Sequence, residues 1–404
     1  MQTLSAAEGM GGTIKAVADD FLVEEITKNG VVLEIGRSYT PEELGIGKGG
    51  EDSKFSVFVM QKKGWNTLQA LKEVGAKCGR GIRSMGFAGT KDRTSVSTQL
   101  CSVFGAKPET VMGVHVKDIQ INGAWPSDKK VDLGELLGNR FTIRVTGVRH
   151  PENLAAIDRE LGGLFPNYYG LQRFGTRDNN VDIGVDMLKG DFKSAAMRFL
   201  TDTTNESNEE AINARIRLKG DEDFVEALEY FPRHLKYERM LLNSLSEVDT
   251  DFGRAIRKLP RTLSLMFIHS VESYIFNREV ELRVKERRME PEEGDRVCGA
   301  DSYGFPDINA DAPGTGKRFI VGNTVGYDTP LNAVQKKLLG ELGITQEQFR
   351  MKGMPELNSK GSYRVLFAPY VGFAAQADGS EATMRFSLPS GSYATVLLGE
   401  FIKA

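Results

Sequence analysis

Cysteine, histidine and tryptophan are scarce in this chain of 404 residues, which has three, four and two of them. Cys78, Cys101 and Cys298 lie far apart, without the paired spacing of a zinc site or a disulfide framework. The histidines show no His-x-x-x-His or Glu-x-x-His pairing, and no Gly-x-Ser-x-Gly elbow occurs. The sequence therefore argues against metal chemistry and against hydrolysis by a catalytic triad.

Long apolar runs are also missing. None approaches the roughly 18 residues that a membrane-spanning helix needs. The first residues contain neither the basic segment nor the apolar segment of a secretory signal. These absences predict a cytoplasmic protein, and the length allows about two to three domains with a sizeable core.

No excess charge of one sign is present, since 52 lysines and arginines face 55 aspartates and glutamates, for a net charge of −3. The distribution is uneven, however. Residues 61–100 contain eight bases and two acids, whereas residues 202–223 contain seven acids and three bases. A basic region kept apart from acids suits a phosphate-bearing substrate, and a solvated helix face would explain the same bases equally well.

Short segments rich in β-branched and aromatic residues predict strands in the first part of the chain. They are 21–26, 31–35, 55–60 and 141–145, and the pattern returns at 363–367 and 382–388. Helices are predicted to begin at Thr40-Pro41 and at Asn66-Thr67, where the residues suit an N-cap. Helical periodicity dominates later, at 194–200, 209–218, 223–231, 237–248 and 263–288. A helix-rich segment between sheet-like segments indicates an α+β protein with an insertion, although three domains in series would give the same pattern.

Residues 86–99 form the strongest candidate for a functional loop. Asp92 lies between Lys91 and Arg93, and the surrounding positive charge would keep its carboxylate ionised. A polar turn in which Asp92 caps a helix is the simpler interpretation of this stretch alone.

Two other segments combine aromatic and polar side chains. Residues 167–175 read Asn-Tyr-Tyr-Gly-Leu-Gln-Arg-Phe-Gly, and residues 388–395 read Leu-Pro-Ser-Gly-Ser-Tyr-Ala-Thr. The first segment has the rings, amides and base that stacking and hydrogen bonding to a flat heterocycle require. Either segment alone is more typical of a turn with buried aromatic rings.

Together these segments resemble the TruD-type pseudouridine synthases, which isomerise uridine 13 of transfer RNA, and the resemblance covers nearly the whole chain. The Gly-x-Lys-Asp loop ending in Thr-x-Gln at residues 89–99 is similar to the family signature, which implies that Asp92 is the catalytic nucleophile. Residues 13–25 are similar to the family's opening segment. This similarity implies that Lys15 pairs with the aspartate and that Phe21 lines the uridine pocket.

The two aromatic segments extend the resemblance. They imply Asn167 for substrate binding, Tyr169 as a stacking ring and Tyr393 as a further ring of the pocket. Tyr169 stands where bacterial members have phenylalanine. The basic residues expected to face RNA are Lys62, Lys63, Lys91, Arg93 and Arg173.

The resemblance implies an α+β pseudouridine-synthase fold, with a mixed, mainly antiparallel central sheet flanked by helices and a helix-rich insertion domain. Residues 1–190 and 366–404 would form the catalytic domain, and residues 191–365 an inserted TRUD-type domain. The expected activity is that of an isomerase that acts on tRNA as a monomer, without cofactor or metal.

Pseudouridine formation needs an acid rather than redox or metal chemistry. Asp92 could attack C1′ covalently or abstract the C2′ proton to give a glycal, and both routes require an ionised carboxylate. A non-catalytic RNA-binding protein could use the same basic and aromatic surface. A hydrolase of phosphorylated small molecules would need further carboxylates for a metal beside Asp92, and the loop has none.

Overall fold

The computed structural model describes residues 2–14, 16–50, 52–248, 251–308 and 316–403, and the chain divides into two compact units. One, named here the sheet unit, consists of Thr3–Pro166, Cys298–Phe319 and Phe367–Ala404. The other, the helical unit, consists of Met1–Gln2, Asn167–Val297 and Ile320–Leu366. The long segment of the helical unit thus begins at Asn167, whereas the sequence analysis puts a boundary at 190. The division into a catalytic and an inserted domain stays a prediction.

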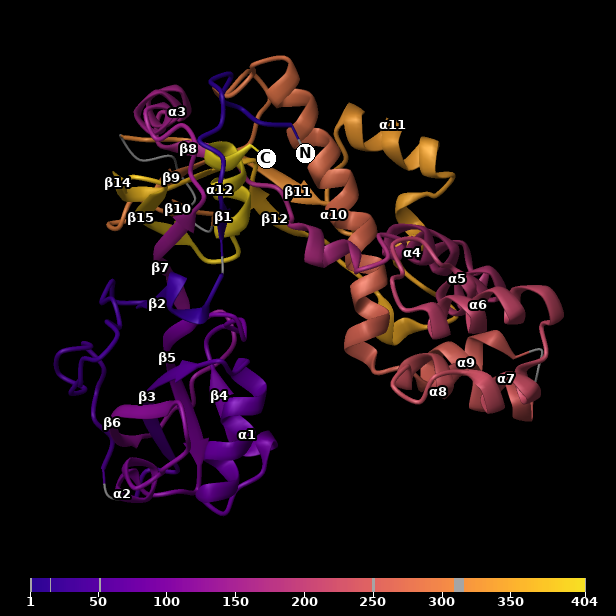
Figure 1. Ribbon diagram of the computed structural model, residues 1–404, viewed down its shortest axis with the longest axis horizontal. Coiled ribbons are helices and arrows are strands. Elements are labelled where there is room, and N and C mark those ends of the chain that lie inside the picture. The colour runs from indigo at the N-terminus through magenta and orange to yellow at the C-terminus, as the bar shows by residue number, and fades with distance from the viewer. Residues whose placement is uncertain (1, 15, 51, 249–250, 309–315, 404) are drawn as a thin grey trace. The chain divides into compact units, whose positions relative to one another are not determined.

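A nine-stranded sheet forms the centre of the sheet unit (Figure 1). Its strands are β1 (Thr13–Ile14), β2 (Phe21–Thr27), β3 (Phe55–Lys63), β4 (Met85–Phe87), β5 (Val96–Phe104), β6 (Ile119–Ser127), β7 (Leu136–Thr146), β14 (Val371–Asp378) and β15 (Glu381–Pro389). The main path runs β14-β15-β7-β2-β5-β3-β6, with β1 paired to β7 and β4 to β5. Only β2 and β5 pair in parallel. The predicted mixed, mainly antiparallel sheet is therefore confirmed.

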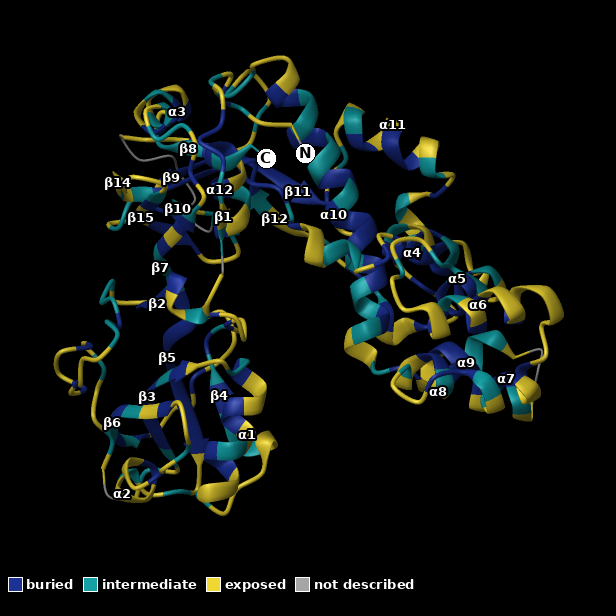
Figure 2. Ribbon diagram, viewed as in Figure 1, coloured by how far each residue is buried: buried dark blue, intermediate teal, exposed yellow. Residues whose placement is uncertain are grey.

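The helices of the sheet unit are α1 (Thr67–Lys77), α2 (Pro108–Met112), α3 (Asn153–Leu161) and α12 (Ala394–Ile402). Helix α1 begins as predicted, because the Asn66 side chain accepts the Gln69 N–H. Leu71 and Val74 of α1 belong to the same apolar cluster as Phe58 of β3. Burial of these side chains from water holds α1 on the sheet, and Figure 2 shows long buried stretches along the strands.

Two predicted elements do not form in the sheet unit. Residues 41–45 make turns instead of a helix, since the capping contacts between Thr40 and Glu43 close a single turn before a glycine-rich stretch. Residues 31–35 supply only an isolated bridge, from Val32 to Ile26. The Ile35 N–H donates instead to the Glu24 carboxylate. Two main-chain bonds to β2 remain, from the Thr27 N–H to the Val31 carbonyl and from the Leu33 N–H to the Glu25 carbonyl, and the side-chain bond at Ile35 ends the pairing.

The helical unit is built around α10 (Arg261–Lys285), and α4 (Asn180–Lys189) packs along it (Figure 1). The other helices are α5 (Phe192–Thr201), α6 (Glu209–Asp221), α7 (Phe224–Tyr230), α8 (Lys236–Glu247), α9 (Phe252–Lys258) and α11 (Ala333–Leu342). Ile268, Val271 and Ile275 of α10 are fully buried in the core of this unit. The predicted helices in this part of the chain are confirmed, with ends shifted by at most three residues.

Short strand pairs complete both units. In the sheet unit, β8 (Leu164–Pro166) pairs with β13 (Phe367–Pro369), and β9 (Val297–Ala300) pairs with β10 (Pro306–Asp307). In the helical unit, β11 (Phe319–Thr324) pairs with β12 (Ser362–Val365). Among the described residues, no helix combines the length and the apolar character that crossing a membrane requires.

Candidate active site

Asp92 lies exposed at the tip of the loop that joins β4 to β5. Its carbonyl oxygen accepts a hydrogen bond of 3.0 Å from Lys62 Nζ and one of 2.9 Å from Ser95 Oγ. Lys62 of β3 and Ser95 of the same loop thus both hold the main chain at Asp92. An acid on such a loop reaches solvent while its backbone stays anchored.

The side chain of Lys91, which precedes Asp92 on the loop, points into the protein. Lys91 is buried, and its Nζ pairs with Glu25 Oε2 of β2 at 2.6 Å, with only 4% and 1% of the two side chains exposed. The other carboxylate oxygen, Glu25 Oε1, accepts the Leu100 N–H of β5. Because Lys91 reaches inward to β2, the adjacent Asp92 is turned outward.

A chain of buried polar groups links the loop to α1 and β5. The Lys91 N–H donates to Thr67 Oγ1 at 2.8 Å, the Thr67 hydroxyl donates to Gln99 Oε1 at 2.8 Å, and Gln99 Nε2 donates to the Gly89 carbonyl. Buried and fully paired networks of this kind restrain the groups they join. The signature residues Lys91 and Gln99 therefore act as the scaffold of the loop.

Burial also changes the acid–base properties beneath Asp92. Lys62 is completely buried, and this burial together with the charge of Lys91 lowers the pKa of its ammonium to about 8, while Asp92 opposes the shift. The main chain at Asp92 is thus anchored by a buried, positively charged side chain. The arrangement suits a carboxylate that acts as nucleophile or base.

The five basic residues expected to face RNA fall into two groups. Lys62 and Lys91 are buried and bonded inside the sheet unit, so their position does not fit direct contact with RNA. Lys63 is exposed and pairs with Asp19, and Arg93 is exposed with its Nε bonded to the Gly64 carbonyl. Arg173, in the helical unit, lies over the Tyr169 ring at 5.2 Å. The excess of bases in residues 61–100 thus serves partly to build the loop.

Two predicted pocket rings, Phe21 and Tyr393, belong to the sheet unit. Phe21 starts β2, pairs with Ile143 and is 4% exposed, with its ring edge-on to Phe141. Tyr393 is half-buried at the N-cap of α12, soon after the end of β15. Lys15, the predicted partner of the aspartate, lies outside the described residues.

Asn167 and Tyr169 belong to the helical unit. Asn167 is 2% exposed, donates from Nδ2 to the Val365 carbonyl and accepts from Arg364 at Oδ1. Arg364 also donates to the Asn167 carbonyl and lies over the Tyr169 ring at 4.4 Å. The Asn277 side chain of α10 bonds both the N–H and the carbonyl of Tyr169. The structure therefore joins the two predicted residues through Arg364 and fixes them to α10.

Sequence reasoning missed three partners of the motif residues, the buried Glu25 and the half-buried Arg364 and Asn277. Glu25 left a signal, because Glu24 and Glu25 are consecutive acids in one strand and successive side chains of a strand point to opposite faces. Arg364 and Asn277 left none, since a single arginine or asparagine in a strand or helix fits a solvated position equally well. Their separation from Asn167 and Tyr169, of 197 and 108 residues, hides the contact.

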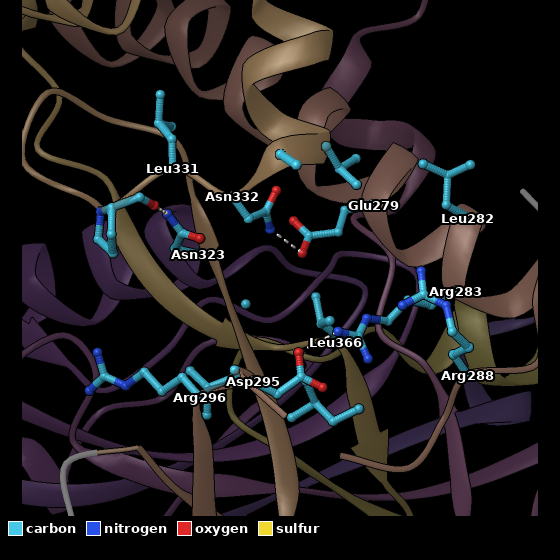
Figure 3. A pocket seen from close by; sticks show the side chains of 17 residues that line it. Glu279, Leu282, Arg283, Arg288, Asp295, Arg296, Asn323, Leu331, Asn332 and Leu366 are labelled. Carbon is cyan, nitrogen blue, oxygen red and sulfur yellow. Dashed lines mark hydrogen bonds and ion pairs between the residues drawn. The ribbon is translucent and has the colours of Figure 1, made fainter. Parts of the chain in front are cut away.

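The helical unit also contains a cleft of about 380 Å³, shown in Figure 3. The Glu279 carboxylate accepts there from Asn332 Nδ2 and Gln335 Nε2, and burial raises the pKa of this acid. Arg283 pairs with Asp295 across the same cleft. Residues predicted as catalytic or RNA-binding are not among those that line it, so the site around Asp92 is a separate feature.

Comparison with known proteins agrees with the fold. The profile of tRNA pseudouridine synthase D (TruD) matches residues 2–401. A protein of Methanosarcina mazei named probable tRNA pseudouridine synthase D is 32% identical, over 98% of this chain and 94% of the relative. A protein of Methanopyrus kandleri with the same name is 35% identical, over 86% and 85%.

A solved structure agrees as well. The crystal structure of a TruD protein from Methanosarcina mazei superposes with a TM-score of 0.78 and 30% identity, over 100% of this chain and 96% of that one. The match of the family profile spans nearly every residue of the chain. The chain therefore belongs to the TruD family of pseudouridine synthases, which are isomerases.

Proposed function

We propose that this chain converts uridine 13 of tRNA to pseudouridine, with Asp92 as the catalytic nucleophile. The observation that carries the proposal is the exposed Asp92 carboxylate on a loop whose other polar groups are bonded inside the sheet unit. An acid held in this way pays little further ordering entropy when the substrate binds. Membership of the TruD family supports tRNA as the substrate class.

The reaction breaks the N1–C1′ bond of the uridine, turns the uracil and joins C5 to C1′. N1 gains a proton and C5 loses one, so atoms balance without a co-reactant. An ionised Asp92 would attack C1′ or remove the C2′ proton.

The other predicted residues receive binding roles in this proposal. The rings of Phe21, Tyr169 and Tyr393 would stack on or enclose the flipped base, and Asn167 would support the uracil edge. Lys63, Arg93 and Arg173 would contact RNA phosphates. Lys15 would pair with Asp92. Lys62 and Lys91 are left out of the RNA-contacting set, because both are buried.

The test is incubation of the purified protein with an unmodified tRNA transcript, followed by mapping of pseudouridine. Release of tritium from C5-labelled uridine measures the rate independently. A matched transcript with cytidine at position 13 should release no tritium from that site. Binding of tRNA without any conversion would favour a non-catalytic RNA-binding protein, and conversion only at another uridine would overturn the position.

A further inference from the structure

The ammonium of Lys62 is hydrogen-bonded to the main chain at Asp92. Lys62 lies on β3 with 0% of the residue exposed. Its Nζ donates to the Trp65 carbonyl at 2.6 Å and to the Asp92 carbonyl at 3.0 Å. Both acceptors are neutral main-chain oxygens, so this buried cation is held by the two segments that it joins.

Three titratable groups influence the pKa of Lys62: Lys91, Asp92 and Cys101. Lys91 lies beside it on the loop, with its own charge paired to Glu25 of β2. The negative charge of Asp92 favours the protonated form of Lys62. The Cys101 thiol of β5 is fully buried, and this burial raises its pKa. Burial and the like charge of Lys91 lower the pKa of Lys62 to about 8, against the attraction of Asp92. Lys62 is therefore expected to lose its proton when the pH rises modestly above neutral.

We propose that Lys62 is a positioning residue for the isomerisation: its protonated ammonium holds the main chain at Asp92 and thereby aims the carboxylate. This inference rests on the proposed role of Asp92. A charged donor bonds a carbonyl about twice as strongly as a neutral one. Loss of the proton therefore loosens the contact at Asp92, while Ser95 Oγ still holds the same carbonyl.

Activity and stability are expected to change in opposite directions with pH. In the unfolded chain the lysine keeps its proton up to about pH 10.4, whereas in the folded protein it loses it near pH 8. Between these values the unfolded state binds more protons, so this group makes the folded state more stable as the pH rises. Over the same range the loop loses its charged anchor and turnover falls. A purely structural lysine would not produce this opposition.

The experiment measures kcat and KM on unmodified tRNA from about pH 6 to about pH 9.5 for the wild type, Lys62→Met and Lys62→Gln. We expect the wild-type kcat to fall with an apparent pKa near 8. Lys62→Met should lower kcat about 10- to 100-fold near neutral pH, leave KM nearly unchanged and remove the alkaline fall. Lys107→Met is the matched control, because Lys107 is an exposed lysine of the same unit, and its profile should equal the wild type.

Urea unfolding across the same range supplies the second readout. The free energy of unfolding should rise between about pH 7 and about pH 9.5 more steeply for the wild type than for Lys62→Met. Wild-type rates in Lys62→Met, or an alkaline fall that persists in it, would overturn the inference. If neither variant folds, a wild-type kcat that stays level up to about pH 9.5 overturns it equally. Activity retained by Asp92→Asn would instead overturn the proposed function, which separates the two failures.

Discussion

The Asp92 loop of the sheet unit and the 167–169 segment of the helical unit differ in how their motif residues are buried and held in place. Asp92 is exposed on a buried polar scaffold, whereas Asn167 is itself buried and bonded on both sides of its amide. Both regions are held by residues distant in the sequence: Glu25 pairs with Lys91 beside Asp92, and Arg364 bonds Asn167. The first region exposes a carboxylate to solvent, whereas in the second region the motif residue Asn167 itself makes the hydrogen bonds that hold the segment.

The largest expected effect comes from removing the displayed acid. Asp92→Asn keeps the shape of the side chain and removes its negative charge, so pseudouridine formation should fall by at least about 1,000-fold. Binding of tRNA should stay within about 3-fold, because the backbone bonds of the loop do not use the carboxylate. Asp132→Asn, at an exposed loop acid of the same unit, is the control and should convert tRNA normally.

The buried scaffold is tested by Glu25→Gln. This change leaves the Lys91 ammonium without its partner in the interior, which should cost about 3 to 5 kcal/mol of unfolding free energy. Glu135→Gln breaks a pair with Lys28 whose side chains are 38% and 59% exposed, and it should cost about 1 kcal/mol or less. Urea titration gives both values. Equal effects for the two variants would contradict the scaffold role of the Lys91–Glu25 pair.

The support in the helical unit is tested by Arg364→Met. It removes the hydrogen bonds to Asn167 and the cation over Tyr169, so we expect kcat/KM for tRNA to fall about 10-fold. Arg350→Met is matched, since Arg350 lies over Tyr327 at the same 4.4 Å but on an exposed surface. A decrease of equal size in both variants would show that only the general stability of the unit is involved.

The smallest effect concerns the exposed bases. Lys63→Gln and Arg93→Gln should each weaken tRNA binding modestly and make the slope of log K against log salt less negative by about 0.7 to 0.9. Lys107→Gln changes an exposed lysine outside the predicted contacts and should leave the slope unaltered. Filter binding at several salt concentrations measures this. Unchanged slopes in all variants would remove both bases from the RNA-facing surface.

Elements with strong local patterns were predicted well. The alternation at 141–145 and the Asn66 cap of α1 are patterns that can be recognised within a few residues of the sequence. The helix at Thr40-Pro41 stops after one capped turn before a glycine-rich stretch, and the strand at 31–35 fails where the Glu24 side chain takes the Ile35 N–H. The burial of Lys62 and Lys91 was missed for a related reason, since charge counts carry no information on depth.

By itself, the sequence determined the family, because its motifs are local, and the resemblance to that family implied the mixed sheet and Asp92 as the candidate acid. The tertiary structure alone decided which basic residues point inward and which distant residues hold the two motif regions. Lys91 meets Glu25 across 66 residues, and Arg364 meets Asn167 across 197. Such contacts exist only after the strands pair and the helices pack, because burial makes the ion pairs and hydrogen bonds selective.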